Sequence, residues 1–487
     1  MKSADKLEVI VAAMVGVLII AFLTHHLSRD GTTPQDNQEL EAFHNRLKDA
    51  PPAYTLEDAR AMAREILPRV EAATGKPFKS IPPIQFITTQ GAADLLARTG
   101  KLELRNGIFQ PPGPRYFQVL AKMLLGVYDH THGTIYLLPQ RLPVILKLLE
   151  LNETSSRDIA RMVIAHELTH ALQDQYMDFS RHLAQVSDTD GLFAFKALVE
   201  GHATWVEKEV AGELGIDDFL IHLSPLADTG KIIFHSPALN QMVQRGGGTS
   251  HLISAYSQGV QFINYHYGMG GRERLWELIE HPPVDPAMIL YPWTYQPHSP
   301  DPLNYQAMLH GIYDFQTHPK GAEVRERNFN LDKLQVKQWA QPLSDNEVQI
   351  LLTGLTHCQT LSVHYRNQVI PLTEITFMAI RDEEAANTLA PLIEKIIFQH
   401  IRNAKPAETI PWKDLTQDGL IPGSRARMVS SIFHRKINGQ QTLFSKSNFL
   451  MGYKDVMVMI SDGFFELSPR EATEIATKVI RRYYPED

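Results

Sequence analysis

The hydrophobic pattern of the chain opens with an unbroken apolar run from Val9 to Leu23, preceded by two lysines, Lys2 and Lys6. Such a run is typical of a transmembrane helix, and positive charges before it favour a cytoplasmic N-terminus with the rest of the chain on the extracytoplasmic side. The run is short for a spanning helix, which leaves a cleaved signal peptide as the alternative, but residues 22–26 lack the small side chains of a cleavage site. We therefore predict a membrane anchor in residues 1–27 of a single-pass membrane protein, with cleaved secretion as the alternative.

Residues 28–51 are polar and contain several prolines, which predicts a tether between the anchor and a folded domain. Thr55 and Asp58 have the spacing of a capping box, and the helical pattern that follows continues to about Thr74, just before Gly75. Short apolar runs of the kind that form strands come next. They are Ile84–Thr88 and Thr134–Leu138.

A long, mostly buried helix is predicted at residues 159–176, because this stretch contains neither glycine nor proline. Ser155 and Asp158 form a second capping-box pattern before it. Two further helical patterns follow, and a cluster of glycines after residue 267 should end the second. These two patterns are Phe193–Leu214 and Tyr256–Tyr267.

Strand patterns dominate beyond about residue 335, which indicates a separate α+β domain at residues 335–487. Asn438-Gly439 lies between two strand-like runs, a strong signal for a two-residue hairpin turn. Ser468-Pro469 has the features of a helix start, and this last helix should end near Tyr483. The other predicted elements are a strand at Ile375–Ile380, a helix at Glu383–Ile401 and a strand at Val456–Ile460.

The fold class predicted from these patterns is α+β: an N-terminal transmembrane helix, a mostly helical domain with a small mixed sheet at residues 52–330, and the C-terminal α+β domain. With 487 residues, 44% hydrophobic and 21% charged, the chain is globular and longer than one core usually organises. The net charge of −8 comes without a basic stripe, which excludes nucleic acid as a partner class. Cys358 is the single cysteine, so it is expected to be a buried small side chain without a disulfide.

Candidate chemistry centres on His166-Glu167-Leu168-Thr169-His170, which fits the pattern His-Glu-x-x-His within a predicted helix. Residues four apart lie on one helical face, so both imidazoles can reach one Zn²⁺ ion. Zinc lowers the pKa of a bound water toward about 7, and Glu167 is placed to take its proton. With 21 histidines in the chain, a chance match is the alternative interpretation.

A catalytic zinc site usually takes three protein ligands and leaves a fourth position for water. The best third candidate is Glu200, a carboxylate within the otherwise apolar stretch Ala197–Ala203. Burial of an unpaired carboxylate is costly, and metal coordination removes that cost. His202 is the competing ligand, but it lies two positions from Glu200 and therefore on another face of the helix.

Together, these residues resemble the gluzincin metallopeptidases, in which His-Glu-x-x-His is followed by a glutamate ligand on a second helix. Glu200-Gly201-His202-Ala203 is similar to the ligand motif of the membrane alanyl aminopeptidase branch, although its longer distance from His170 implies an insertion. Tyr256-Ser257-Gln258-Gly259 resembles the Tyr-x-Lys-Gly motif of the same branch, with Gln258 in place of lysine. The resemblance implies that Tyr256 stabilises the oxyanion of the transition state, whereas a tyrosine packed in a helix is the alternative.

A second resemblance, to a family of uncharacterised bacterial and archaeal zinc peptidases, covers about a quarter of the chain. His202 stands where that family tends to have aspartate. The C-terminal domain carries no resemblance. The matching segments are residues 166–175, 197–203, 282–284 and 289–290.

The ligand imidazoles need acceptors for their remaining N–H groups, and Asp174 and Asp190 are the candidates for this role. Residues 128–138 are expected, from the resemblance, to form an edge strand over the cleft, where an extended peptide can pair as an added strand.

The sequence thus predicts a membrane-anchored zinc metallohydrolase, most simply an endopeptidase, that acts on a peptide or protein substrate. Trimming of N-terminal residues is disfavoured, because the chain has no Gly-x-Met-Glu-Asn-like segment, by which the aminopeptidases bind free amino termini. One alternative is a membrane-anchored assembly or binding protein with a structural or degenerate zinc site, whose C-terminal domain binds a partner that the sequence does not identify. Another is zinc-dependent hydrolysis of a non-peptide substrate.

Overall fold

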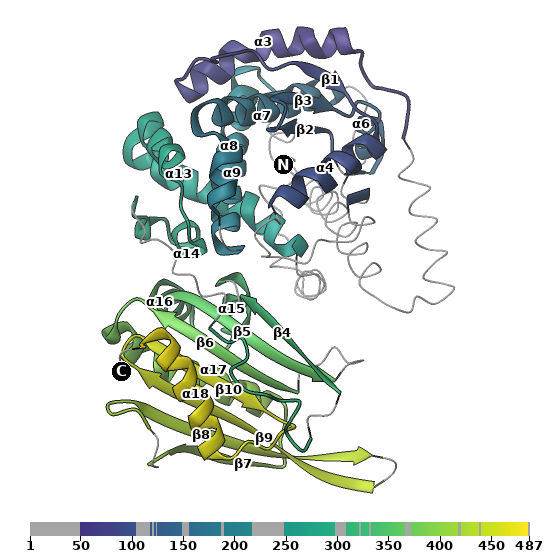
Figure 1. Cartoon of the computed structure of the whole chain (residues 1–487). Helices are drawn as coiled ribbons and strands as arrows, with labels where there is room; N and C mark the ends of the chain where they lie inside the picture. Colours follow the sequence, from purple (N-terminus) through teal and green to yellow (C-terminus); the bar gives the residue numbers. More distant parts are fainter. Residues whose placement is uncertain are drawn as a thin grey trace, which may run out of the picture. The chain divides into compact units, whose positions relative to one another are not determined.

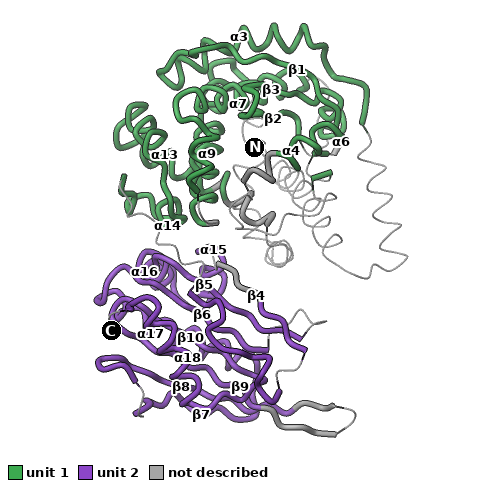
Figure 2. The backbone as a smooth tube through the Cα atoms, viewed as in Figure 1, with its two compact units in different colours: residues 1–299 green, residues 300–487 purple. Residues whose placement is uncertain are grey.

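The computed structural model divides the chain into two compact units, residues 1–299 and 300–487 (Figure 2). The predicted anchor, most of the predicted tether and the Asn438-Gly439 turn lie outside the described residues. Within the described part of the chain, no helix combines the length and the apolarity needed to cross a membrane. The structure describes residues 49–103, 117–118, 121–122, 124–148, 155–186, 189–216, 248–297, 308–320, 323–330, 333–365, 372–416, 420–437 and 440–485.

The described part of unit 1 contains helices and one small sheet (Figure 1). The first described helix, α3 (Leu56–Thr74), begins at the predicted capping box, in which Thr55 and Asp58 bond each other's backbone N–H groups. The sheet has the order β1-β3-β2, with β1 parallel and β2 antiparallel to β3, so β2 is an edge strand. The remaining elements here are β1 (Ile84–Phe86), α4 (Thr89–Glu103), β2 (Gly126–Asp129), β3 (Thr134–Leu137) and α6 (Leu142–Leu148).

Three long helices form the other part of unit 1, where the sequence predicts them. One local prediction was wrong: the Ser155 side chain makes no capping hydrogen bond. The glycine cluster does interrupt the third helical pattern as predicted, since Gly270 and Gly271 have non-helical backbone angles, with φ of 62° at Gly271. A further helical stretch follows them to Glu280, and the range of α13 includes both stretches. The helices are α7 (Ser156–Met177), α9 (Thr189–Glu213) and α13 (Gly248–Glu280), accompanied by the shorter α8 (Phe179–Gln185), α14 (Pro286–Leu290) and η2 (Pro292–Thr294).

Helices α9 and α13 touch at two glycines that leave no room for a side chain. A Cβ atom added to Gly201 would lie 2.3 Å from the carbonyl carbon of Gly259, and one added to Gly259 would lie 2.0 Å from the backbone oxygen of Ala197. Glu200 and Tyr256 flank this contact, one on each helix. The contact therefore explains why both sequence motifs contain a glycine, and it holds the two side chains near each other.

Replacing Gly259 by alanine should lower the free energy of unfolding by about 1–3 kcal/mol, since overpacking forces the two helices apart. Thermal unfolding of the purified protein measures this change. Gly212→Ala is the matched control, because Gly212 is an exposed position in α9 with nothing within 4 Å of an added Cβ. That variant should unfold at the wild-type temperature or slightly above it. Equal melting temperatures for Gly259→Ala and the wild type would contradict the close contact.

Unit 2 is built on a seven-stranded antiparallel sheet with helices on both faces (Figure 1). Helix α18 packs on the face that carries Val363, Phe377 and Val458. Helix α17 contacts the same central strands but adds no residue to that cluster, so it covers the opposite face. In spatial order the strands are β4 (Val324–Asn330), β5 (Leu355–Tyr365), β6 (Thr373–Ile380), β10 (Val456–Asp462), β9 (Gln440–Tyr453), β8 (Arg425–Ile437) and β7 (Glu408–Asp414), and the helices are α15 (Lys333–Trp339), α16 (Asp345–Gly354), α17 (Glu383–Asn403) and α18 (Pro469–Tyr483).

The α+β class of the fold agrees with the prediction, but the boundary between the units lies earlier than expected. Strand β4 pairs with β5 along its whole length, so residues 324–330 belong to unit 2 rather than to the helical domain. Cys358 is buried, as expected, on strand β5.

Candidate metal centre

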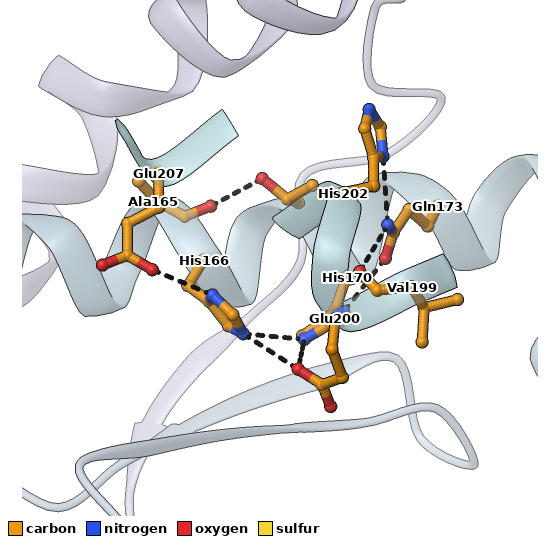
Figure 3. A network of polar contacts seen from close by, with 9 residues as sticks. Ala165, His166, His170, Gln173, Val199, Glu200, His202 and Glu207 are labelled. Carbon is orange, nitrogen blue, oxygen red and sulfur yellow. Dashed lines mark hydrogen bonds and ion pairs between the residues drawn. The ribbon is translucent and has the colours of Figure 1, made fainter. Parts of the chain in front are cut away.

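Three side chains from two helices meet at one point in unit 1. His166 and His170 lie one turn apart on α7, and Glu200 extends toward them from α9 (Figure 3). The two Nε2 atoms are 3.1 Å apart, and Glu200 Oε2 lies 3.3 Å from each of them. Among the described residues, these three form the one group of histidine, cysteine or acidic side chains whose ligand atoms all lie within 4.8 Å of one another.

The spacing of these three atoms fits a tetrahedral zinc site. Bond lengths of about 2.0–2.2 Å to nitrogen and oxygen place tetrahedral ligand atoms roughly 3.3–3.5 Å apart. The observed triangle of 3.1, 3.3 and 3.3 Å is close to this size. The side chains of His166, His170 and Glu200 keep exposed fractions of 14%, 11% and 19%, so solvent reaches the group. With a zinc ion held by these three side chains, one tetrahedral position would remain for water, as in catalytic rather than closed structural sites.

The remaining nitrogen of each imidazole is also bonded. His166 Nδ1 lies 3.0 Å from Glu207 Oε2, and His170 Nδ1 lies 2.9 Å from Gln173 Oε1. Glu207 and Gln173 are both buried, so each holds an imidazole in one orientation.

The sequence-based choice of acceptors was therefore wrong. Asp174 instead accepts hydrogen bonds from the Tyr128 hydroxyl at 2.8 Å and from the backbone N–H of Phe179 at 2.7 Å. Asp190 holds neither imidazole, since both Nδ1 atoms are already bonded to other residues. Glu207 follows Glu200 by two helical turns, and Gln173 follows His170 by three positions, so helical spacing was the signal that pointed to both.

Burial and neighbouring charges shift the pKa values of the side chains in this group. Burial lowers the pKa of His166, but hydrogen bonds and charge from Glu200 and Glu207 more than offset this and raise it well above its usual value. Burial raises the pKa of Glu200, and the neighbouring imidazoles, His170 first, outweigh burial and lower it. The carboxylate of Glu200 is thus kept ionised, which is the form that binds a metal.

Glu167 is buried against the edge strand β2, at a position where that strand has no side chain. A Cβ atom on Gly126 would lie 2.9 Å from Glu167 Oε1. The backbone N–H of Tyr128 donates a hydrogen bond to the Glu167 carboxylate. Burial raises the pKa of Glu167, although the imidazoles of His170 and His166 oppose this. A carboxylate with a raised pKa next to the metal group is suited to accept a proton.

Tyr256 stands over the same group from α13. Its ring is stacked on that of His166, with centroids 6.3 Å apart and planes at 18°, and its hydroxyl is hydrogen-bonded to Glu200. Burial first, and then the charge of Glu200, raise the pKa of Tyr256 well above its usual value. The hydroxyl is therefore protonated at neutral pH and is a hydrogen-bond donor at the centre.

His202 is directed away from the metal group. Its Nδ1 atom lies 3.0 Å from Gln173 Nε2, and its ring packs between Trp205 and Trp276. Burial lowers the pKa of His202 to about 3. The structure thus gives His202 a place behind the ligands, whereas the sequence left it as a competing ligand.

No known family model matches the chain, and no significantly similar protein was found among curated proteins or among solved structures. The resemblances to gluzincins and to the uncharacterised zinc peptidases therefore rest on the motif residues and on the geometry of this centre.

Proposed function

We propose that the protein is a zinc-dependent hydrolase of the gluzincin type, an endopeptidase held at a membrane by its N-terminal segment. The observation that carries this proposal is the triangle of His166 Nε2, His170 Nε2 and Glu200 Oε2, with sides of 3.1–3.3 Å. Glu167 and Tyr256 lie beside this triangle with the properties of a proton acceptor and a hydrogen-bond donor.

In this proposal each residue has a separate task. When bound, zinc acts as a Lewis acid that lowers the pKa of a water molecule, so that the water can lose a proton and act as a nucleophile at neutral pH. Glu167 takes a proton from the attacking water and passes it to the leaving amine. Tyr256 donates its hydroxyl hydrogen to the oxygen on which negative charge develops. Glu207 and Gln173 keep the two imidazoles in the orientation that directs Nε2 to the centre.

Strand β2 supports a peptide as the substrate. Leu125 and Leu138 are joined by a backbone hydrogen bond of 2.9 Å, and Tyr128 is paired with Ile135. In an antiparallel pair the bonded positions alternate, so the backbone groups of Gly126 and Tyr128 point away from β3. The Tyr128 N–H already reaches Glu167 there. An extended peptide that pairs with this edge would lie beside the general base.

Zinc content and chelation test the proposal. The purified protein should contain about one zinc per chain, and removal of the metal by a chelator should abolish cleavage of a peptide library, with recovery on adding zinc back. A chain that carries zinc but cleaves no peptide, under conditions in which a known metallopeptidase does, would favour the binding-protein alternative. A chain without affinity for zinc would refute the proposal.

Tyr256→Phe should lower kcat by about 10- to 1000-fold and leave zinc content and KM close to wild type, because the oxyanion is present mainly in the transition state. The ring keeps its packing on His166, so the fold should be retained. Steady-state kinetics with a defined peptide measures the change. Tyr265→Phe is the control, since that tyrosine lies on the same helix but is 38% exposed. An unchanged kcat in Tyr256→Phe would show that Tyr256 only packs against its neighbours and does not stabilise the oxyanion.

A further inference from the structure

Gln173 lies in a buried chain of contacts behind the metal group (Figure 3). Its side chain is fully buried and has three polar neighbours. Oε1 lies 2.9 Å from His170 Nδ1, and Nε2 lies 3.0 Å from both the backbone oxygen of Val199 and His202 Nδ1. The amide oxygen and the amide nitrogen of Gln173 therefore both have polar partners.

The carbonyl of Val199 fixes which way the amide is turned. A backbone oxygen only accepts hydrogen bonds, so the amide atom that faces it must be the nitrogen. The oxygen of Gln173 must then face His170, and His170 Nδ1 must carry the hydrogen. In the neutral imidazole, which is the form that binds a metal, the lone pair of His170 is then on Nε2, the atom that lies 3.1 Å from His166 Nε2 and 3.3 Å from Glu200.

His202 accepts the second hydrogen of the same amide. Its side chain is 1% exposed, and its ring is stacked on Trp205 at an angle of 11° and meets the edge of Trp276 at 79°. These contacts hold Nδ1 toward Gln173. If this acceptor were absent, an amide N–H would be left buried without a partner, and a rotated amide would remove the acceptor from His170.

We propose that Gln173 and His202 are positioning residues: Gln173 fixes the tautomer and orientation of His170 as a metal ligand, and His202 keeps Gln173 in the orientation that does so. This inference rests on the proposed zinc site. It assigns a second task to the segment 199–202 of α9, which supplies Glu200 as a ligand and also orients the ligand His170 on α7. His166 is held differently, by the carboxylate of Glu207.

The test is the dissociation constant for zinc of the full-length protein, measured by competition with a chromophoric chelator. Gln173→Met keeps the length of the side chain without its hydrogen bonds and should weaken zinc binding by about 10- to 100-fold. His202→Leu should weaken binding through the same route, so it should add little in the Gln173→Met background. His202→Asn should restore most of the affinity, because asparagine carries an acceptor oxygen one bond beyond Cγ, where histidine carries Nδ1.

Val206→Ala controls for loss of packing, since Val206 is a fully buried residue of α9 outside this chain of contacts. It should lower the melting temperature of the metal-free protein without changing zinc affinity. Three results would each overturn the inference: zinc affinity within about twofold of wild type in Gln173→Met, additive effects in the double variant, or equal losses in His202→Asn and His202→Leu. In each case, zinc binding by the wild-type protein would leave the proposed function standing. A wild-type protein that binds no zinc would refute both.

Discussion

Glu167→Gln is expected to reduce kcat/KM for peptide hydrolysis by about 100- to 10,000-fold while the protein keeps its full zinc content. Glutamine has the shape of glutamate, so it still fits against Gly126 and can still accept the N–H of Tyr128. It has no basic oxygen that can take a proton from water. The loss should therefore fall on the chemical step, and zinc analysis with steady-state kinetics separates the two effects.

The control for this variant is an exposed glutamate of the same unit that has no proposed part in catalysis. Glu213 on α9 pairs with Arg69 at the surface, with side-chain exposures of 48% and 35%. Glu213→Gln should retain wild-type kinetics, because an exposed pair of this kind contributes little. If Glu167→Gln hydrolyses peptides as fast as the wild type, Glu167 has no part in proton transfer.

The three side chains that meet at the candidate centre could be selected from the sequence because each leaves a local signal there. His166 and His170 are four positions apart in a stretch that contains neither glycine nor proline, and the structure makes that stretch a helix. Glu200 is a lone carboxylate in an apolar segment, and α9 indeed places it beside the two imidazoles. Spacing within one helix and the cost of a buried charge were enough to select these residues.

The surroundings of the ligands were not predictable in the same way. Gly126 accommodates Glu167 only because β2 packs on α7, a contact between distant parts of the chain. Asp174 was predicted, from its charge, to accept a hydrogen bond from a ligand imidazole. In the structure Asp174 binds Tyr128 instead, and the neutral Gln173 faces His170 Nδ1. Such pairings depend on how helices and strands pack against each other, which local patterns in a single sequence do not reveal.

The fold shows the same division between local and non-local signals. The hairpin of β8 and β9 was expected from the two strand-like runs on either side of Asn438-Gly439, and both strands are present and paired. Strand β5 was missed because most of its residues are buried on both faces of the sheet, which removes the alternation. Strand β7 was missed because it is a mostly exposed edge strand that includes Pro411.

His166→Ala is expected to raise the dissociation constant for zinc by about 1000-fold or more. Total binding free energies for zinc are about 10–16 kcal/mol, so the loss of one of three protein ligands should cost several kcal/mol, and each 1.4 kcal/mol corresponds to a factor of ten. Competition with a chelator measures the change. His132→Ala is the matched control, because the His132 side chain is 58% exposed and lies outside the ligand group.

A second variant is needed because His166→Ala also leaves Glu207 without its partner. The Glu207 side chain is only 8% exposed, and an unpaired carboxylate at that depth destabilises the fold. Glu200→Gln avoids this difficulty, since it keeps the shape of the ligand and removes its charge. It should lose zinc with a comparable fall in affinity, while the metal-free protein unfolds near the wild-type temperature. Wild-type zinc affinity in Glu200→Gln would remove α9 from the metal centre, and with it the gluzincin-like ligand set.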